Sequence, residues 1–279
     1  TSIIKKNYNF ESSLYALLMI AFSWYWLDYN LEVRHSAVTN VALIFSIYII
    51  SCFKKYPILR TIIIGFSIGV AINSRIILLP LGIILLIIIC LVRKKININI
   101  SALKFLILYT LGGLIASINS LYILFYDYNL FIFDYLNHRI LYGESRTVTT
   151  TALDALNVFF LSKESITNCI FLIPIAAWLI SDLFRFNKIN LKKIYDYPLS
   201  IITLSMIIGI YICYSFADRY ASSYLHHLIP FFILFGIGVY SQTLKEQSTK
   251  INNYILRIPV VLGILLLIFE FTFNASTSI

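Results

Sequence analysis

The chain has few charged residues. Asp, Glu, Lys and Arg make up 13% of its 279 residues, and hydrophobic residues make up 59%. A soluble domain has about 25% charged residues, so this shortage excludes an ordinary soluble domain. The sequence predicts an all-α fold, a polytopic transmembrane helical bundle, because helices satisfy their own backbone hydrogen bonds inside a bilayer.

Motifs that hold metals or nucleotides are also lacking. None of Cys52, Cys90, Cys169 and Cys213 has a CxxC or metal-ligand spacing, and no HxxxH or HExxH pair occurs. We therefore expect no metal site, although a need for a divalent metal stays open. The thiols are expected to be apolar membrane cysteines, and the alternative is a disulfide between Cys169 and Cys213. The lack of a glycine-rich phosphate loop argues against an enzyme that uses nucleotide sugars.

A starting methionine and a cleavable signal peptide are absent as well. The chain begins at Thr1, so we expect a fragment that lacks its amino-terminal part. Membrane spans themselves serve as insertion signals, so a cleavable peptide is not required.

Apolar runs predict nine membrane spans. They cover roughly residues 13–27, 36–53, 61–74, 76–92, 103–125, 168–184, 198–216, 224–242 and 255–273. We expect them to form one transmembrane domain over residues 1–279, with an outer juxtamembrane segment at 126–167. The host membrane would be a bacterial or archaeal cell membrane, or the ER membrane of a eukaryote.

The connections between these spans alternate in charge. Sixteen of the 22 lysines and arginines fall in one set of connections, which the positive-inside rule makes cytoplasmic. They are Lys5, Lys6, Lys54, Lys55, Arg60, Arg93, Lys94, Lys95, Lys104, Arg185, Lys188, Lys192, Lys193, Lys245, Lys250 and Arg257. This placement explains the net charge of +9 without a nucleic-acid partner. Asp182, near the cytoplasmic end of its span, is expected to reach water as an end charge.

The outer connections carry the side chains best suited to chemistry. They hold the other six cations and all four histidines: Arg34, Arg75, Arg139, Arg146, Lys163, Arg219, His35, His138, His226 and His227. A long, wet loop accounts for Lys163. It accounts less well for Arg75 and Arg219, because each lies in a short connection at the membrane.

Arg75 is the single charge in an apolar run from Thr61 to Val92. One helix over this run would be about 48 Å long, far beyond the ~30 Å hydrocarbon layer. Two short spans that meet near residues 73–75 fit better and place Arg75 at or slightly below the outer headgroups. A guanidinium there costs several kcal/mol unless an anion or water meets it. Arg75 is therefore either an anion-binding residue or a snorkelling helix anchor.

Two further outer stretches are candidates for a site. Asp28 and Glu32 are spaced i, i+4, so one helical turn would place both on one face, and a carboxylate beside a histidine can act as a general base. A polar cap before the next span is the alternative. Farther along, aromatic residues recur from Phe131 to Tyr142 at helical spacing. They predict an interfacial amphipathic helix that either serves as an anchor or brings Arg139 to a lipid-linked phosphate.

Three of these stretches together resemble the polyprenyl-phosphate-sugar glycosyltransferases of the GT-C superfamily, such as the dolichyl-phosphate-mannose protein mannosyltransferases and the aminoarabinose transferases. The shared features are a Gly-x-x-x-Gly with a following arginine, an outer aromatic segment, and a late Arg-Tyr connection that leads into a proline. The matching positions are Gly65, Gly69, Arg75 and Pro80, then Phe131, Phe133, His138 and Arg139, then Arg219, Tyr220, Tyr224 and Pro230. The resemblance covers roughly residues 15–240.

The resemblance implies transfer of a sugar from a polyprenyl-phosphate donor to a glycan, lipid or protein acceptor at the outer face. Its implied donor-binding residues are Arg75, Arg219, Arg139, His138, Tyr220 and Tyr224, because arginine forks bind phosphate and tyrosines stack on sugar or line a lipid groove. A carboxylate would accept the proton of the acceptor. The first outer loop of the family, which usually carries the catalytic acid, is missing if the chain is a fragment. Glu32 is then a second acidic position, and otherwise Asp28 or Glu32 is the base.

Three other functions stay open. A transporter or flippase of a lipid-linked anion would use the same arginines, but it should also show broken helices and ionisable residues near the midplane. An O-antigen-type polymerase or ligase would share the outer chemistry. A non-catalytic subunit would tolerate loss of Arg75, Arg219 and Glu32. The sugar, the acceptor, the organism and the oligomeric state do not follow from the sequence.

Overall fold

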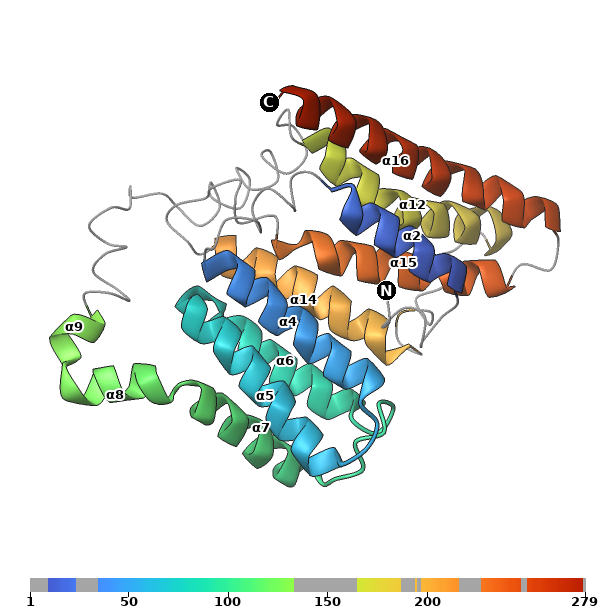
Figure 1. The fold of residues 1–279 in the computed structure, drawn as a ribbon. Helices are drawn as coiled ribbons and strands as arrows, with labels where there is room; N and C mark the ends of the chain where they lie inside the picture. The colour runs from blue at the N-terminus through green and yellow to red at the C-terminus, as the bar shows by residue number, and fades with distance from the viewer. Residues whose placement is uncertain are drawn as a thin grey trace. The chain divides into compact units, whose positions relative to one another are not determined.

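A computed structural model of the chain describes residues 10–23, 35–132, 165–186, 194, 197–215, 227–246 and 250–277. The regular structure within these ranges is helical (Figure 1), so the all-α prediction is confirmed there. Contacts group the chain into two compact units. Unit 1 comprises residues 1–32, 158–207 and 225–279, and unit 2 comprises 33–157 and 208–224. The prediction of a single transmembrane domain stays a prediction.

Unit 2 is built mainly from consecutive helices. They are α4 (His35–Cys52), α5 (Pro57–Ser74), the 3-10 helix η1 (Ile76–Leu78), α6 (Leu79–Val92), α7 (Ala102–Ala116), α8 (Ile118–Tyr126) and α9 (Tyr128–Ile132), together with the end of α14 (Pro198–Ser215). Helix α4 is antiparallel to α5, because Thr39 near its start contacts Ser74 at the end of α5.

Helices α5 and α7 run in parallel and meet backbone to backbone. A Cβ added at Gly65 would lie 2.0 Å from the Tyr109 carbonyl oxygen, and one at Gly112 would lie 2.1 Å from the Ile62 carbonyl oxygen. One turn farther along, a Cβ at Gly69 would lie 2.9 Å from Cα of Gly113. Small residues one turn apart allow this approach, as in the small-xxx-small pairs of membrane helices.

Arg60 fastens the other end of these helices. Its side chain is fully buried, and the guanidinium donates hydrogen bonds to the carbonyl oxygens of Ile49, Ile50 and Ile96. The first two carbonyls belong to the last turn of α4, where carbonyls lack partners inside the helix, and Ile49 also accepts from the Phe53 N–H just beyond it. The third lies just after α6. One cation therefore ties together the end of α4, the start of α5 and the segment that follows α6.

Unit 1 contains the first and last described helices. They are α2 (Phe10–Ala21), α12 (Ser165–Phe186), α15 (Ile229–Glu246) and α16 (Lys250–Thr277), with the start of α14. Helices α2 and α16 run in parallel, because Glu11 pairs with Arg257 near their starts and Phe22 meets Phe271 edge-to-face near their ends. Helix α12 packs on both α15 and α16, and it lies alongside α16 in Figure 1.

Most predicted apolar runs coincide with helices, but two expectations and one alternative need correction. The run at 103–125 is two helices bent by 65° at Ser117. Asp182 does not reach water: it is 1% exposed and accepts a hydrogen bond from Trp178 Nε1 at 2.9 Å. The alternative of a disulfide at Cys213 is wrong, because its thiol is free.

Membrane crossing is a separate matter from helix formation. By length and composition, one described helix, Pro57–Ser74, is able to span a bilayer, and the bent pair α7–α8 would make a second span if it crosses as one. Six further apolar stretches of described helix, among them Phe10–Ala21 and Ile229–Lys245, are shorter by this measure, at 10–17 residues. The nine-span topology therefore stays a prediction.

Candidate functional site

The helix break at Arg75 is the centre of the candidate site. Helix α5 ends at Ser74, and Arg75 is extended, with φ −149° and ψ 93°. Its backbone N–H donates to the carbonyl oxygens of Ala71 and Ile72, which closes the helix, and its own carbonyl accepts from Leu78 as η1 begins. Pro80 then lies in the first turn of α6, where a missing N–H costs nothing. The predicted break near residues 73–75 is confirmed.

Arg75 is set apart from the other described cations of its unit. The described stretch 35–132 contains eight lysines and arginines, and Arg75 is half-buried at one end of the helices. The other seven lie at the opposite end: Lys54, Lys55, Arg60, Arg93, Lys94, Lys95 and Lys104. An anion that approaches the end with Arg75 therefore meets this one guanidinium, among the residues described there.

Asn73 organises the polar groups next to Arg75. Its Nδ2 lies 2.9 Å from the Gly69 carbonyl oxygen, 3.0 Å from the Ala116 carbonyl oxygen and 3.0 Å from Ser117 Oγ. Its Oδ1 accepts a 2.7 Å hydrogen bond from Ser120 Oγ. One amide thus joins the end of α5 to the bend between α7 and α8.

A hydroxyl pair continues this polar cluster toward α4. Thr39 Oγ1 and Ser74 Oγ are 2.8 Å apart, and Ser74 Oγ also lies 2.9 Å from the Ala71 carbonyl oxygen. The two residues before the break, Asn73 and Ser74, therefore fix the helix end on two sides. Because arginine is a planar fork of donors that suits phosphate and carboxylate, the arrangement is chemically suited to an anion flanked by polar groups.

The sequence did not single out Asn73 as a site residue, nor its partners Ser117 and Ser120. A signal was present: an amide inside an apolar run needs hydrogen-bond partners once it is buried. The identity of those partners was not readable, because they lie more than 40 residues along the chain. Conversely, Gly65 and Gly69, chosen for a family resemblance, have a packing role against α7.

The remaining predicted site residues lie outside the described residues. They are the carboxylates Asp28 and Glu32 and the expected donor-binding residues His138, Arg139, Arg219, Tyr220 and Tyr224. Of the predicted set, Arg75 is the one whose surroundings the structure gives. Roles for the other residues stay predictions.

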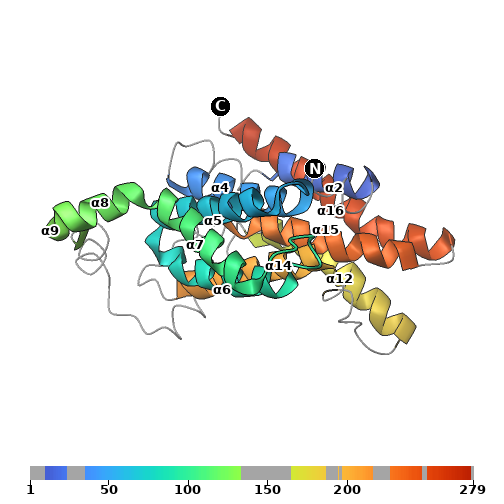
Figure 2. The same cartoon turned by 90° about the horizontal axis from the view of Figure 1, so that it is seen from below.

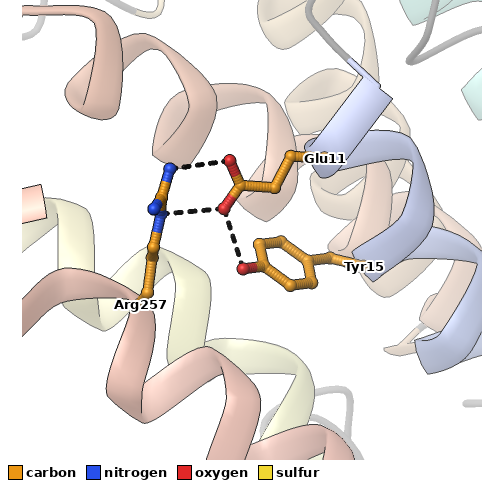
Figure 3. Close-up of polar contacts among 3 residues, drawn as sticks. All are labelled: Glu11, Tyr15 and Arg257. Carbon is orange, nitrogen blue, oxygen red and sulfur yellow. Dashed lines mark hydrogen bonds and ion pairs between the residues drawn. The ribbon is translucent and has the colours of Figure 1, made fainter. Parts of the chain in front are cut away.

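Unit 1 has a polar cluster of its own, shown in Figure 3. Arg257 Nε lies 2.8 Å from Glu11 Oε1, and Arg257 Nη2 donates to Glu11 Oε2 at 2.8 Å, so the pair is bidentate. Tyr15 donates a 2.8 Å hydrogen bond to the same Oε1. The two charged side chains are 31% and 36% exposed. Because every described group here already has a partner in the cluster, we assign it to helix association between α2 and α16.

Comparison of the chain with protein-family models, with curated proteins and with solved structures gives no match. Within the described ranges, no three His, Cys, Asp or Glu side chains gather in a way that would hold a metal ion. The geometry around Arg75 is therefore the basis for a functional proposal.

Proposed function

We propose that the chain is a multi-pass membrane glycosyltransferase that moves a sugar from a polyprenyl-phosphate donor to an acceptor at the outer face. The observation that carries this proposal is the place of Arg75: a half-buried guanidinium at a helix break, at the end of unit 2 opposite to seven other cations. The donor's phosphate is the anion that Arg75 binds.

Outward-facing apolar stripes support the membrane setting. Helix α7 exposes Leu103, Leu106, Ile107, Leu111, Leu114 and Ile115, and α16 exposes Ile258, Val261, Leu262, Leu265, Leu266 and Phe269. In each helix these residues recur every three or four positions, so they form a continuous face. Polar residues such as Arg60, Thr61 and Ser67 are buried instead. Large exposed apolar faces are unusual in soluble monomers, whereas lipid covers them at no cost.

Helix directions and charges support the proposed sidedness. The alternating nine-span topology requires α5 to run parallel to α7, and α2 to run parallel to α16. The contacts within each pair give these same directions. In unit 2 the cation-rich end is then cytoplasmic by the positive-inside rule, and Arg75 is at the outer end. This sidedness gives Arg75 access to a lipid-linked donor in the outer leaflet.

For this reaction the protein mainly has to place charged groups correctly around the substrates. Phosphate is a good leaving group, so positive charge on the departing phosphate and a carboxylate that takes the acceptor proton are the main requirements. Arg75 supplies the first, with Arg219 and Arg139 as its proposed partners. Glu32 or Asp28 supplies the second, unless the base lies in a part of the protein that precedes Thr1.

The test uses the full chain in lipid nanodiscs with a polyprenyl-phosphate donor that carries a radiolabelled sugar. We expect wild type to release or transfer the sugar and Arg75→Ala to lose about 100-fold or more in rate, because one preorganised charge contact in a transition state contributes on this scale. Arg75→Lys should recover only part of the rate, since an ammonium lacks the bidentate fork.

The matched control is Lys94→Ala, which removes an exposed cation from the opposite end of unit 2 and should leave the rate unchanged. A folded Arg75→Ala variant with wild-type activity would exclude Arg75 from the site. A wild-type protein that binds the lipid but never cleaves it would exclude the glycosyltransferase.

One observation favours a second candidate, a transporter of a lipid-linked anion. Transporters use broken helices at their binding sites, and the described part of unit 2 has two breaks, at Arg75 and at Ser117, joined by Asn73. In proteoliposomes with a fluorescent polyprenyl-phosphate lipid in one leaflet, a transporter moves the intact lipid to the other leaflet. A glycosyltransferase cleaves it without moving it.

A further inference from the structure

The end of α7 carries a bent arm, which we define as α8 plus α9, Ile118–Ile132. At Ser117 the chain turns by 65° from the axis of α7. Neither α8 nor α9 has a buried residue. In both overall views these two helices extend past the end of α7, and no other helix of unit 2 runs beside them (Figure 1 and Figure 2). The arm therefore projects from its junction with α7.

That junction is a defined hydrogen-bonded clamp. Ser117 Oγ donates to the Gly113 carbonyl oxygen at 2.9 Å, a back-bond that tends to bend helices. The Asn73 amide reaches across from α5 to the Ala116 carbonyl and to Ser117 Oγ, and Ser120 donates to Asn73 Oδ1. Residues on both sides of the bend are therefore fixed to the helix end that carries Arg75.

The exposed side of the arm is aromatic. Tyr122, Phe125, Tyr126 and Tyr128 are 63%, 85%, 79% and 62% exposed, and the rings of Tyr122 and Tyr126 stack at 5.4 Å. Tyrosine has an apolar ring and a polar hydroxyl, which is why it collects at the headgroup level of membranes. The arm has no lysine or arginine, and its one charge, Asp127, caps the start of α9 by accepting from Leu130 N–H.

We propose that this arm lies in the headgroup layer of the outer leaflet, with its tyrosines and Phe125 in contact with lipid, and that Asn73 is the positioning residue that sets the bend. This inference rests on the membrane setting proposed above and not on catalysis. The bend turns the chain toward the bilayer plane, because along the axis of α7 each residue of α8 advances only about 0.6 Å, against about 1.5 Å within α7. Lipid headgroups and acyl chains are the partner.

The first experiment measures depth. Single spin labels at Leu103, Ile107 and Leu114 in α7, and at Ile118, Tyr122 and Phe125 in α8, are placed in the full chain with its native cysteines replaced, in lipid nanodiscs. Collision with oxygen reports lipid, and collision with a water-soluble nickel chelate reports water. We expect depth to change steeply along α7 and less than half as steeply along α8, with Phe125 near the headgroups.

Other outcomes are decisive as well. High nickel access at Phe125 would mean that the arm lies in water, and low access to both probes would mean that it is buried in protein; either result overturns the proposal. A depth gradient as steep in α8 as in α7 would make the pair one continuous span, which also overturns it. Labels in α7 without oxygen access would overturn the membrane setting itself, so the two failures are distinguishable.

The second experiment tests the clamp. Spin labels at Ile107 and Phe125 should be about 23 Å apart along the bent backbone and about 27 Å apart if the helix straightens. We expect Asn73→Ala to broaden the distance distribution toward the longer value. Ser74→Ala removes the contacts with Thr39 on α4 and with the Ala71 carbonyl oxygen and leaves the clamp bonds of Asn73 in place, so it should keep the wild-type distance. Ser120→Ala removes one bond of the clamp and serves if Asn73→Ala does not fold. An unchanged distribution in both clamp variants would overturn the role of Asn73.

Discussion

Two parallel helix pairs, one in each unit, are joined by different means. In unit 2, α5 and α7 touch through backbone atoms at Gly65 and Gly112, where there is no room for a single methyl group. In unit 1, α2 and α16 are joined by side chains, with the Glu11–Arg257 pair at one end. The backbone contacts between α5 and α7 depend on shape, and no other interaction can replace them. The ion pair between α2 and α16 depends on charge and is partly exposed, so water and salt can replace it. We therefore expect mutations to have much larger effects in the first pair.

The largest effect is expected at Gly112. In Gly112→Ala the new methyl would lie 2.1 Å from the Ile62 carbonyl oxygen, and the backbone of α5 must move to relieve the clash. Such overpacking costs roughly 1–3 kcal/mol and occasionally more, and we expect a value near the top of this range. Unfolding of the full chain in mixed micelles, followed by circular dichroism against detergent composition, measures the loss.

The neighbouring glycine is the matched control. A Cβ at Gly113 would lie 3.8 Å from the Gly65 carbonyl oxygen, an ordinary contact, and alanine is the better helix former by up to about 1 kcal/mol. Gly113→Ala should therefore be neutral or slightly stabilising. Equal losses in the two variants would mean that general helix propensity, and not the close approach of α5 and α7, decides the result.

The next effect is expected at Arg60. Arg60→Ala removes the side-chain donor of the Ile50 and Ile96 carbonyls, and Ile49 keeps only its bond from the Phe53 N–H. Each buried acceptor left unsatisfied costs about 1–3 kcal/mol. Because water can enter the space that the side chain leaves, we expect a net loss of about 2 kcal/mol in the same unfolding assay. The control is Lys94→Ala, which removes a cation from the same end and so changes the topology signal equally. Because Lys94 is exposed, this variant should lose little stability. A large loss in Lys94→Ala would assign the effect to charge rather than to the capped carbonyls.

Arg60 also shows what charge counting cannot give. The alternation of charge along the sequence predicted that Arg60 lies on the same side as the cations that follow α4 and α6. The contacts of Arg60 with the end of α4 and with the segment after α6 agree with this prediction. Counting charges assigns a residue to one side of the membrane, but it does not say how deeply the side chain is buried. Burial of Arg60 depends on carbonyls of α4 and of the segment after α6, and these are defined only when the three segments meet.

The two helix breaks differ in the same way. The break at Arg75 was predictable, because the apolar run around it is too long for one span and contains Asn73, Ser74 and Pro80. The break at Ser117 was not, because the run at 103–125 has a length that suits one span and its bend depends on Asn73, 44 residues earlier in the chain. Hydropathy reports how apolar a stretch is, but it does not report hydrogen bonds from another helix. For the candidate site, therefore, Arg75 was found from the sequence and the cluster that surrounds it was not.

The smallest effect is expected at the ion pair of unit 1. Glu11 and Arg257 are about one-third exposed, and exposed pairs contribute roughly 0–1 kcal/mol, with bidentate geometry favouring the upper half of this range. A double-mutant cycle with Glu11→Gln, Arg257→Gln and the double variant should give a coupling energy below about 1 kcal/mol that falls as KCl rises toward 1 M, because salt screens exposed charges. Tyr15→Phe, which removes only the hydroxyl bond to Glu11, is the uncharged control and should not depend on salt. A salt-independent coupling of about 3 kcal/mol or more would mean that this pair is shielded from water, as in a buried ion pair. The α2–α16 contact would then be as intolerant of change as the glycine contact between α5 and α7.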